Sequence, residues 1–432
     1  MSPREAARRI FQAALAAADP APLVARALAR PEARARLEGA ARVVVLGCGK
    51  AAGAMARAVE AALAPRIAAG LVVVKDGYRA PTRVVEVAEA GHPVPDARGV
   101  RAAARLLELA RAAGPDDLVL VLVSGGGSAL AVAPAPPVTL EDKQAVTRLL
   151  LAAGATIDEL NAVRKHLSLL KGGQLARAAA PAPVLALILS DVVGDRVDVV
   201  ASGPTAPDPT TFADALAVLE RRGVRPRVPP TVLARLEAGA AGAIPETPKP
   251  GDPLFDRVLN LVVGDNALVL AAAADAARAL GYAPHVLTRT LTGEARAVAR
   301  RLVAEARALA GPACLLAGGE TTVTVRGAGR GGRCQEFALA AALELAPDDA
   351  LVVLAAGTDG TDGPTDAAGA LVDAGTVARG RAAGQDARRA LEDNDAYTFL
   401  RAAGDLLETG PTNTNLLDIY LLLQPGRGVP AR

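Results

Sequence analysis

Short apolar runs that end in a glycine-rich segment recur along this chain. In α/β proteins such a run is a buried parallel strand, and the glycine begins the loop that leads to the next helix. Ligands of open α/β sheets bind at the carboxyl ends of the strands, where glycine lets an anion approach the backbone amides. Four segments have this form: Gly47–Lys50 after VVVL, Ser124–Ser128 after LVLVLV, Gly318–Thr322 after CLLA, and Gly357–Gly363 after LVVLAA. The pattern predicts an α/β fold with a large, highly charged ligand, for which a nucleotide phosphate is the leading candidate.

The order of strand and helix patterns predicts two α/β domains. Residues 239–253 carry four prolines and show no periodicity, which is typical of a linker. We therefore expect residues 1–245 to form a Rossmann-like domain with a mostly parallel sheet, and residues 254–432 to form a smaller α/β domain. The active site is expected in the cleft between the domains. Two amphipathic helices, over 4–18 and 22–38, either belong to the first domain or cover both.

Composition excludes several classes of partner. The net charge is +2 and aromatic residues make up 2% of the chain, with no Trp, which argues against nucleic-acid binding. The first residues lack the apolar core of a secretory signal, and no run approaches the roughly 18 apolar residues of a membrane span. The three cysteines lack CxxC spacing, which argues against a disulfide framework or a zinc site. We expect a cytoplasmic protein that contacts neither nucleic acid nor membrane.

The first glycine-rich segment permits two interpretations. Residues 47–53, GCGKAAG, fit the dinucleotide fingerprint G-x-G-x-x-A, and Asp76 ends the next strand, where a ribose ligand would stand. An NAD(P)H-dependent dehydrogenase is therefore an alternative. A cation at the start of a helix opposes the helix dipole, so Lys50 beside Gly49 indicates an anionic ligand shared with the amides. A solvated lysine on a helix-opening turn is the other explanation.

The second glycine-rich segment is predicted to bind an anion. Three consecutive glycines directly follow a fully apolar strand, which favours an anion cradle over a simple tight turn. The segment matches neither the P-loop nor the nucleophile elbow. The predicted binding residues are Ser124, Gly125, Gly126, Gly127 and Ser128.

A polar stripe is expected on the helix near residue 161. Asn161, Arg164, Lys165 and Ser168 are spaced i, i+3, i+4 and i+7, so they share one face. A solvated helix face and a ligand-binding face explain the stripe equally well.

Two carboxylates follow the apolar strand 184–190. Asp191 and Asp195 could bind Mg²⁺ or orient a hydroxyl group, although an Asp/Gly turn would show the same residues. Their position at a strand end favours the functional interpretation.

The second half contributes an arginine loop and further carboxylates. A strand is expected over 322–326, and the segment GAGRGGR then leads into a helix with Arg333 at its start. Arginine suits a bidentate clamp on phosphate or carboxylate. Asp359 and Asp362 fail the EF-hand spacing, but Mg²⁺ needs only one or two carboxylates beside substrate phosphates.

Taken together, these segments resemble the class II glycerate 2-kinases, whose C-terminal part is called the MOFRL domain. The resemblance covers about residues 43–420, and the matching stretches come in order: GCGKAAGAM, GHPVPD, VSGGGSAL, LNAVRKHLSLLKGG, LSDVVGD, ASGPTAPDPT, AGGETTVTVRG, GRGGRCQEFAL, AAGTDGTDGPTDAAGA and TGPTNTNLLD. The ordered set is specific, although no single stretch is decisive. Family members have also been labelled hydroxypyruvate reductases, which agrees with the dinucleotide fingerprint.

The resemblance implies an ATP- and Mg²⁺-dependent phosphorylation of D-glycerate, usually at the 2-hydroxyl, in the cleft between a Rossmann-like and a MOFRL-type domain. The family's essential Lys and Arg match Lys50 and Arg333, and its aspartates match Asp191, Asp195 and Asp359. Their separate roles, the regiochemistry and the preferred phosphoryl donor stay open, and a homodimer is compatible with the sequence. Cys334 departs from the Asn that is commoner at that position, which puts any substrate contact there in doubt.

A mechanism follows as a hypothesis. Lys50 and Arg333 would clamp the γ-phosphoryl group, Asp191 or Asp195 would orient or deprotonate the glycerate hydroxyl, and Asp359 would bind Mg²⁺. The Ser124–Ser128 amides would hold a phosphate or the substrate carboxylate, for which Arg164 is a second candidate. Further residues of the matched stretches complete the predicted substrate and nucleotide site: Gly49, Asn161, Glu320, Thr358 and Asn413.

Overall fold

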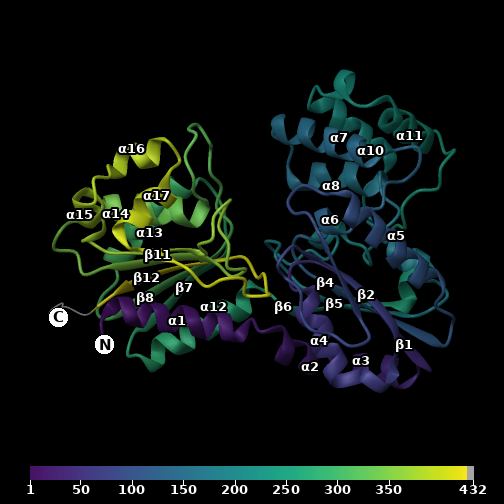
Figure 1. Ribbon diagram of the computed structural model, residues 1–432, viewed down its shortest axis with the longest axis horizontal. Coiled ribbons are helices and arrows are strands. Elements are labelled where there is room, and N and C mark those ends of the chain that lie inside the picture. Colours follow the sequence, from purple (N-terminus) through teal and green to yellow (C-terminus); the bar gives the residue numbers. More distant parts are fainter. Residues whose placement is uncertain (426–432) are drawn as a thin grey trace. The chain divides into compact units, whose positions relative to one another are not determined.

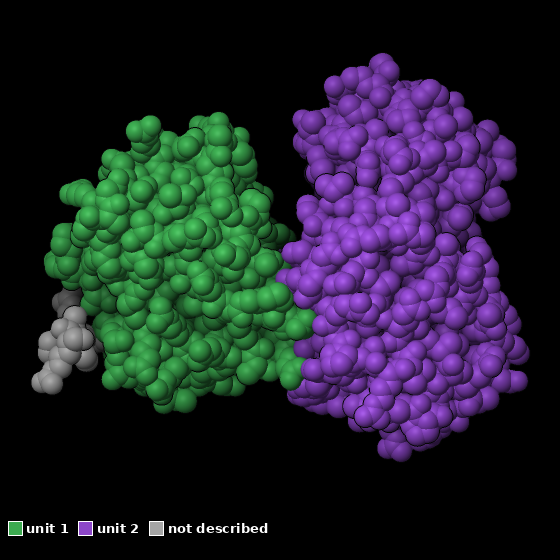
Figure 2. All heavy atoms as spheres, in the orientation of Figure 1, with its two compact units in different colours: residues 1–19, 264–432 green, residues 20–263 purple. Residues whose placement is uncertain are grey.

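The computed structural model describes residues 1–425, which fold into two compact units. Among the described residues, unit 1 comprises 1–19 and 264–425, and unit 2 comprises 20–263 (Figure 2). Both units are α/β, as predicted. No helix among the described residues is long and apolar enough to cross a membrane.

Unit 2 is built on a six-stranded sheet with the order β3-β2-β1-β4-β5-β6. The pairs β3–β2, β2–β1, β1–β4 and β4–β5 are all parallel, which confirms the mostly parallel Rossmann-like sheet. Strands β1, β4 and β5 are almost entirely buried, because apolar side chains face helices on both sides of the sheet. The strands are β1 (Arg42–Cys48), β2 (Ile67–Lys75), β3 (Glu86–Ala90), β4 (Asp117–Val123), β5 (Val184–Leu189) and β6 (Val258–Gly264).

The helices of unit 2 fall into two groups. Helices α4, α5 and α9 accompany the sheet, whereas α7, α8, α10 and α11 surround a separate apolar core and lie together at one end of the unit (Figure 1). The helices are α2 (Pro20–Leu28), α3 (Pro31–Glu38), α4 (Ala52–Leu63), α5 (Ala97–Arg111), α6 (Gly127–Leu130), α7 (Leu140–Ala152), α8 (Ile157–His166), α9 (Gln174–Ala179), α10 (Phe212–Arg221) and α11 (Pro230–Ala240), with short 3₁₀ turns η1 (Ala64–Arg66), η2 (Val200–Ser202), η3 (Arg225–Arg227) and η4 (Pro253–Arg257).

Unit 1 contains a mixed sheet with the order β11-β10-β9-β12-β8-β7. Strand β12 lies between β8 and β9 and is antiparallel to both, so it begins where those two strands end. This is the smaller α/β domain that the sequence predicted. Its strands are β7 (Ala283–Leu291), β8 (Ala313–Gly319), β9 (Val352–Gly357), β10 (Gly369–Val372), β11 (Leu406–Leu407) and β12 (Asp418–Gln424).

Helices cover the mixed sheet of unit 1. Helices α13 and α14 pack together over an apolar core that includes Phe337 and Tyr420, and α1 and α12 pack against each other. The helices are α1 (Pro3–Ala17), α12 (Asn266–Ala279), α13 (Ala295–Arg307), α14 (Arg333–Glu344), α15 (Thr376–Ala382), α16 (Ala387–Glu392) and α17 (Ala396–Ala403).

The compact units differ from the expected division in two places. Helix α1 packs with the second half of the chain, because Arg4 bonds Asp373, Asp405 and the Leu371 carbonyl. The proline-rich stretch 239–253 lies inside unit 2, where the Asp208 N–H donates to the Pro248 carbonyl, and the units divide at 263/264.

Candidate functional site

Three predicted segments of unit 2 meet at one edge of its sheet. Because β1, β4 and β5 are adjacent and parallel, the segments that follow them share the edge at their carboxyl ends. The Lys50 N–H donates to the Gly125 carbonyl at 2.9 Å, and the Ser124 N–H donates to the Cys48 carbonyl at 3.1 Å. The lysine turn and the Ser124–Ser128 loop therefore form one rigid structure.

Gly49 makes this close approach possible. Its φ is +131°, and a Cβ there would lie 2.1 Å from Ser124 Oγ. The Ser124 hydroxyl in turn accepts a hydrogen bond from the Ala51 N–H, and the Ala52 N–H donates to the Gly49 carbonyl. The N–H groups of Lys50, Ala51 and Ala52 are thus used within the protein, and an anion shared between Lys50 and the amides that follow stays a prediction. The Lys50 side chain itself lies beside Gly126, where a Cβ would be 3.5 Å from Lys50 Cγ.

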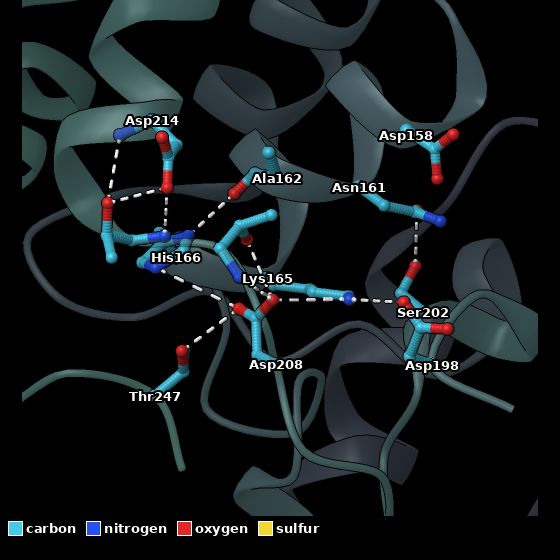
Figure 3. Close-up of polar contacts among 12 residues, drawn as sticks. Asp158, Asn161, Ala162, Lys165, His166, Asp198, Ser202, Asp208, Asp214 and Thr247 are labelled. Carbon is cyan, nitrogen blue, oxygen red and sulfur yellow. Dashed lines mark hydrogen bonds and ion pairs between the residues drawn. The ribbon is translucent and has the colours of Figure 1, made fainter. Parts of the chain in front are cut away.

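The polar face of α8 is buried, so the solvated alternative is wrong. Asn161 and Lys165 are 3% and 2% exposed. Lys165 Nζ lies 3.3 Å from Asp208 and 3.6 Å from Asp198, which compensates its charge (Figure 3). This network anchors α8 to the segments that follow β5.

Asn161 belongs to a second chain of hydrogen bonds. Ser202 Oγ donates to Asn161 Oδ1 at 2.9 Å, and Ser128 Oγ lies 2.7 Å from Ser202 Oγ (Figure 3 shows the first of these contacts). These hydrogen bonds link the predicted residues Asn161 and Ser128 through Ser202, which was not among the predicted site residues.

A cavity of about 360 Å³ opens beside these residues, between α6, α7 and α8. We call it the α7–α8 cavity. Gly126, Ser128 and Arg164 line it, together with two buried lysines, Lys143 and Lys171. Unit 1 has a larger cavity of about 460 Å³ beside α1, but none of the predicted site residues lines it.

Burial lowers the pKa of three basic groups that line the α7–α8 cavity, Lys143, Arg164 and Lys171. The Lys171 pKa falls to about 8, through burial and the nearby Arg164. Burial lowers the Lys143 pKa well below its ordinary value, and the charges of Lys171, Arg164 and Arg235 lower it further. Burial also lowers the pKa of Arg164. These lowered pKa values indicate that the protonated, positively charged forms are destabilised in the cavity, and a bound anion would stabilise them.

The two aspartates after β5 lie in different settings. Asp191 follows Ser190 directly at the strand end, whereas Asp195 sits in a turn with φ of +53° whose N–H donates to the Val192 carbonyl. Neither residue lines the α7–α8 cavity. Their roles stay predictions.

Asp76, the ribose ligand of the dehydrogenase alternative, has a different partner. Its two carboxylate oxygens accept from the Arg98 guanidinium at 2.7 and 2.8 Å. Asp76 and the N–H groups of Lys50, Ala51 and Ala52, which the dehydrogenase interpretation would use for the dinucleotide, therefore already have partners within the protein.

In unit 1, sheet topology brings a third set of residues together. Asp418 begins β12 and pairs in register with Gly319 on one side and Gly357 on the other. The segments after β8 and β9 therefore meet at Asp418. Arg333, the first residue of α14, donates to Asp418 from Nε at 2.6 Å and from Nη2 at 2.8 Å, and its Nη1 lies 2.9 Å from Glu320.

Charges at the start of α14 shift the pKa values of the groups around Arg333. Burial alone would lower the pKa of Arg333, but Asp418 and Glu320 outweigh it and hold the pKa well above its ordinary value. Asp362 is 1% exposed and accepts the N–H groups of Cys334 and Gln335. Its burial raises its pKa to about 7 against the opposing effects of Arg333 and those N–H groups. Cys334 is 0% exposed, and burial and the nearby carboxylates raise its thiol pKa, so it is a packed, protonated thiol.

Thr358 and Asn413 have local structural functions. The Thr358 hydroxyl donates to the Leu417 carbonyl and accepts the Leu416 N–H, both at 2.7 Å. Asn413 has φ of +58° in the loop before β12. A ligand contact by either residue stays a prediction.

Asp359, the predicted metal ligand, lies near Asp418 beside Gly357. Its Oδ1 accepts the Thr361 N–H at 3.0 Å, and the Asp418 Oδ1 accepts from Arg333 at 2.8 Å. Residues 1–425 contain no group of three or more His, Cys, Asp or Glu arranged to hold a metal ion. A nucleotide-bound Mg²⁺ draws most of its ligands from phosphates and water and needs only one or two carboxylates, so the metal role of Asp359 stays a prediction.

The comparisons with known proteins cover both units. The chain matches a family described as Domain of unknown function (DUF4147) over residues 6–237 and the MOFRL family over residues 313–418. A "Putative hydroxypyruvate reductase" of Agrobacterium vitis is 46% identical, over 98% of this chain and 95% of that protein. The "Glycerate 2-kinase" of Pyrococcus horikoshii is 40% identical over 98% of both chains. The crystal structure of a glycerate kinase from Thermotoga maritima aligns with a TM-score of 0.84 and 40% identity, over 98% of this chain and 99% of that one.

Proposed function

The chain belongs to the glycerate 2-kinase family that combines a DUF4147 domain with a MOFRL domain, and from that premise we propose how its residues perform the reaction. The protein is an ATP-dependent kinase that phosphorylates D-glycerate at the 2-hydroxyl, giving 2-phosphoglycerate and ADP. The single observation that carries this conclusion is the 40% identity to a glycerate 2-kinase over 98% of both chains.

Arg333 is proposed to stabilise the charge of the transferring phosphoryl group. A guanidinium has five N–H donors, and the contacts to Asp418 and Glu320 use three of its nitrogens, so two N–H groups remain for a ligand. Asp418 is fully buried, whereas the Glu320 side chain is 47% exposed. An incoming phosphate can therefore displace Glu320 while Asp418 keeps the guanidinium in place. Groups that are oriented before the reaction stabilise the transition state without reorganising.

Lys50 and Asp191 are proposed to act from unit 2. The lysine turn is fixed by the Lys50–Gly125 and Ala51–Ser124 hydrogen bonds, so the ammonium starts from a rigid backbone. We assign it to the phosphoryl oxygens. Asp191, at the end of the neighbouring strand β5, is assigned to orient or deprotonate the glycerate hydroxyl, with Asp195 as the other candidate.

Mg²⁺ is proposed as the metal that accompanies ATP. Asp359 would hold the ion, which would neutralise phosphate charge when bound. A cytoplasmic location and assembly as a homodimer stay predictions from the sequence.

The NAD(P)H-dependent hydroxypyruvate reductase is the weaker alternative. A relative that is 46% identical to this chain is called a putative hydroxypyruvate reductase. The Asp76–Arg98 pair and the hydrogen bonds from the Lys50, Ala51 and Ala52 N–H groups to other protein atoms count against it.

One assay separates these functions. The protein is incubated with ATP, Mg²⁺ and D-glycerate, and the product is given to enolase alone. Enolase dehydrates 2-phosphoglycerate directly, so we expect immediate phosphoenolpyruvate. A signal that needs added mutase would instead indicate phosphorylation at the 3-hydroxyl. NADH oxidation with hydroxypyruvate and no ADP release would indicate the reductase.

Two variants test the residue assignments in the same assay. Lys50→Ala and Arg333→Ala should each lower kcat by about 10²–10³-fold, the usual loss when one charge-stabilising donor is removed. Arg330→Ala is the matched control, because Arg330 lies three residues before Arg333 and stacks on Tyr397 instead of bonding the acidic cluster. Near-normal turnover of either variant would contradict its assignment.

A further inference from the structure

Lys143, Arg164 and Lys171 place three basic groups in the α7–α8 cavity. Lys171 Nζ donates to the Ser128 and Ala131 carbonyls at 2.8 and 3.2 Å, and Lys143 Nζ donates to the Leu167 carbonyl at 2.9 Å. Within residues 1–425, no ion pair involves Lys143, Lys171 or Arg164. Charged side chains are rarely buried without a counter-charge, because desolvation is costly. A bound anion would supply it.

Lys165 has the acidic partners that Lys143, Arg164 and Lys171 do not have among the described residues. Lys165 is equally buried on the neighbouring face of α8, yet Asp208 and Asp198 compensate it (Figure 3). Arg164 is the next residue towards the helix start and faces the cavity instead. Among the described residues, nothing forms a hydrogen bond with its guanidinium. Its planar set of N–H donors is therefore free to bind a carboxylate in bidentate fashion.

A hydroxyl acceptor stands beside these cations. Ser202 donates its proton to Asn161 Oδ1, so the proton in the 2.7 Å contact between Ser128 and Ser202 must come from Ser128. Ser128, which lines the cavity, then donates its only hydroxyl proton to Ser202. Its oxygen can only accept a further hydrogen bond.

We propose that the α7–α8 cavity binds the acid substrate, with Arg164 and Lys171 holding the carboxylate and Ser128 Oγ accepting a hydrogen bond from a hydroxyl of a 2-hydroxy acid. The inference rests on the proposed function and deepens it by assigning the acid site. Ser202 and Asn161 are positioning residues, since they act by directing the Ser128 proton away from the cavity. A keto acid has no hydroxyl proton on C2 to offer, so this arrangement disfavours it there.

The rest of the cavity strengthens the ionic contacts. Val132 is buried in the wall, and Pro93 and Ala129 line it as well. Apolar surroundings lower the local dielectric, so a carboxylate would be bound more strongly there than at an open surface. The Gly126 position, beside Lys50, also lines the cavity, so the acid would lie next to the lysine assigned to phosphoryl transfer.

Direct binding without ATP tests the carboxylate assignment. Isothermal titration calorimetry with D-glycerate on the full chain should show binding to the wild type and about 10–100-fold weaker binding to Arg164→Gln, which removes a charge-assisted contact. Arg101→Gln is the control, since Arg101 is an exposed arginine on α5 outside the cavity, and it should bind like the wild type. Absence of D-glycerate binding by the wild type, or unchanged affinity in Arg164→Gln, would overturn the proposal.

The ratio of affinities for D-glycerate and hydroxypyruvate tests the hydroxyl acceptor. Ser128→Ala should lower this ratio about 2–10-fold, the value of one neutral hydrogen bond. Ser202→Ala should lower it too, but should add nothing in the Ser128→Ala background, because it acts through Ser128. Additive losses, or an unchanged ratio in Ser128→Ala, would contradict the assignment.

The two proposals can fail separately. Phosphorylation of D-glycerate with normal binding by Arg164→Gln would leave the kinase and reject this cavity as the acid site. Loss of D-glycerate binding in Arg164→Gln, without any phosphorylation by the wild type, would leave the acid site and reject the kinase.

Discussion

Asp362 retains its proton at a pH where most carboxyl groups have lost theirs. Burial raises its pKa to about 7 from an ordinary value of 3.8. Between these values the folded protein binds a proton that the unfolded chain releases. The resulting stabilisation is complete below pH 4 and is lost as the pH rises through 7. At roughly 1.4 kcal/mol per pKa unit, the full change is about 4 kcal/mol.

Asp362→Asn should remove this dependence on pH. The amide oxygen can still accept one of the two N–H groups at the start of α14, but the side chain no longer titrates. We expect the free energy of unfolding from urea titrations at pH 5, 6, 7 and 8 to fall with pH in the wild type and to change less in the variant. Asp349→Asn is the control, because the Asp349 pKa is already lowered and its charge is constant over this range. Parallel curves for wild type and Asp362→Asn would contradict the prediction.

Individual site residues could be predicted where the neighbouring sequence alone indicates their function. Glu320 and Arg333 were both selected, and they form an ion pair. Asp418 was missed although its stretch was noted, because only the antiparallel insertion of β12 between β8 and β9 shows that it meets both segments. Lys171 was missed because its ammonium group is buried against the Ser128 and Ala131 carbonyls. These residues lie on α6 and directly after it, far from Lys171 in the sequence.

At the scale of elements, the contact between the turns after β1 and β4 depends on one glycine. Gly49→Ala would place a Cβ 2.1 Å from Ser124 Oγ at φ of +131°. Backbone strain and overpacking together should destabilise the protein by about 2–5 kcal/mol. The urea midpoint measured by circular dichroism checks this.

Gly77→Ala is the matched control for that substitution. Gly77 also has positive φ, at +81°, but nothing lies within 4 Å of its Cβ position. Only the backbone cost of about 1–2 kcal/mol applies. Equal losses for the two variants would show that the contact with Ser124 does not matter.

Elements were predictable where an apolar run or a proline defines them. The strands before the glycine-rich segments were all found. The helix expected over 22–38 is instead two helices, because Pro31 stands in the first turn of α3. The prediction of a strand over 322–326 is wrong. Thr322 forms an isolated β-bridge with Glu294, and the segment does not continue as a strand. Side chains replace the sheet partner there: Glu294 accepts the Thr324 N–H, and Asn394 accepts the N–H groups of Arg326 and Gly327.

At the scale of the whole molecule, α1 belongs to the unit formed by the second half of the chain. Arg4 compensates Asp405, whose side chain is 1% exposed, and Arg379 shares that carboxylate. Arg4→Ala should therefore destabilise unit 1 by roughly 1–3 kcal/mol. Hydrogen exchange should become faster in α1 and β10 and stay unchanged in β1 and β4.

Arg9→Ala is the control on the same helix. Arg9 forms an exposed pair with Glu5 one turn away, and such pairs contribute less than about 0.5 kcal/mol. Faster exchange throughout unit 2 in Arg4→Ala would mean that the two units unfold together.

The placement of α1 also has a consequence for biosynthesis. Residues 20–263 form an insertion within unit 1, so the ribosome makes α1 before unit 2 and makes the packing partners of α1 after unit 2. At roughly 5–20 residues per second, α1 waits on the order of 10–50 s for α12 and on the order of 20–80 s for β12. During that interval unit 2 can fold, while the apolar face of α1, with Ile10 and Phe11, is uncovered. The nascent chain therefore exposes an apolar helix face, of the kind that chaperones bind, until α12, β9 and β12 have been made.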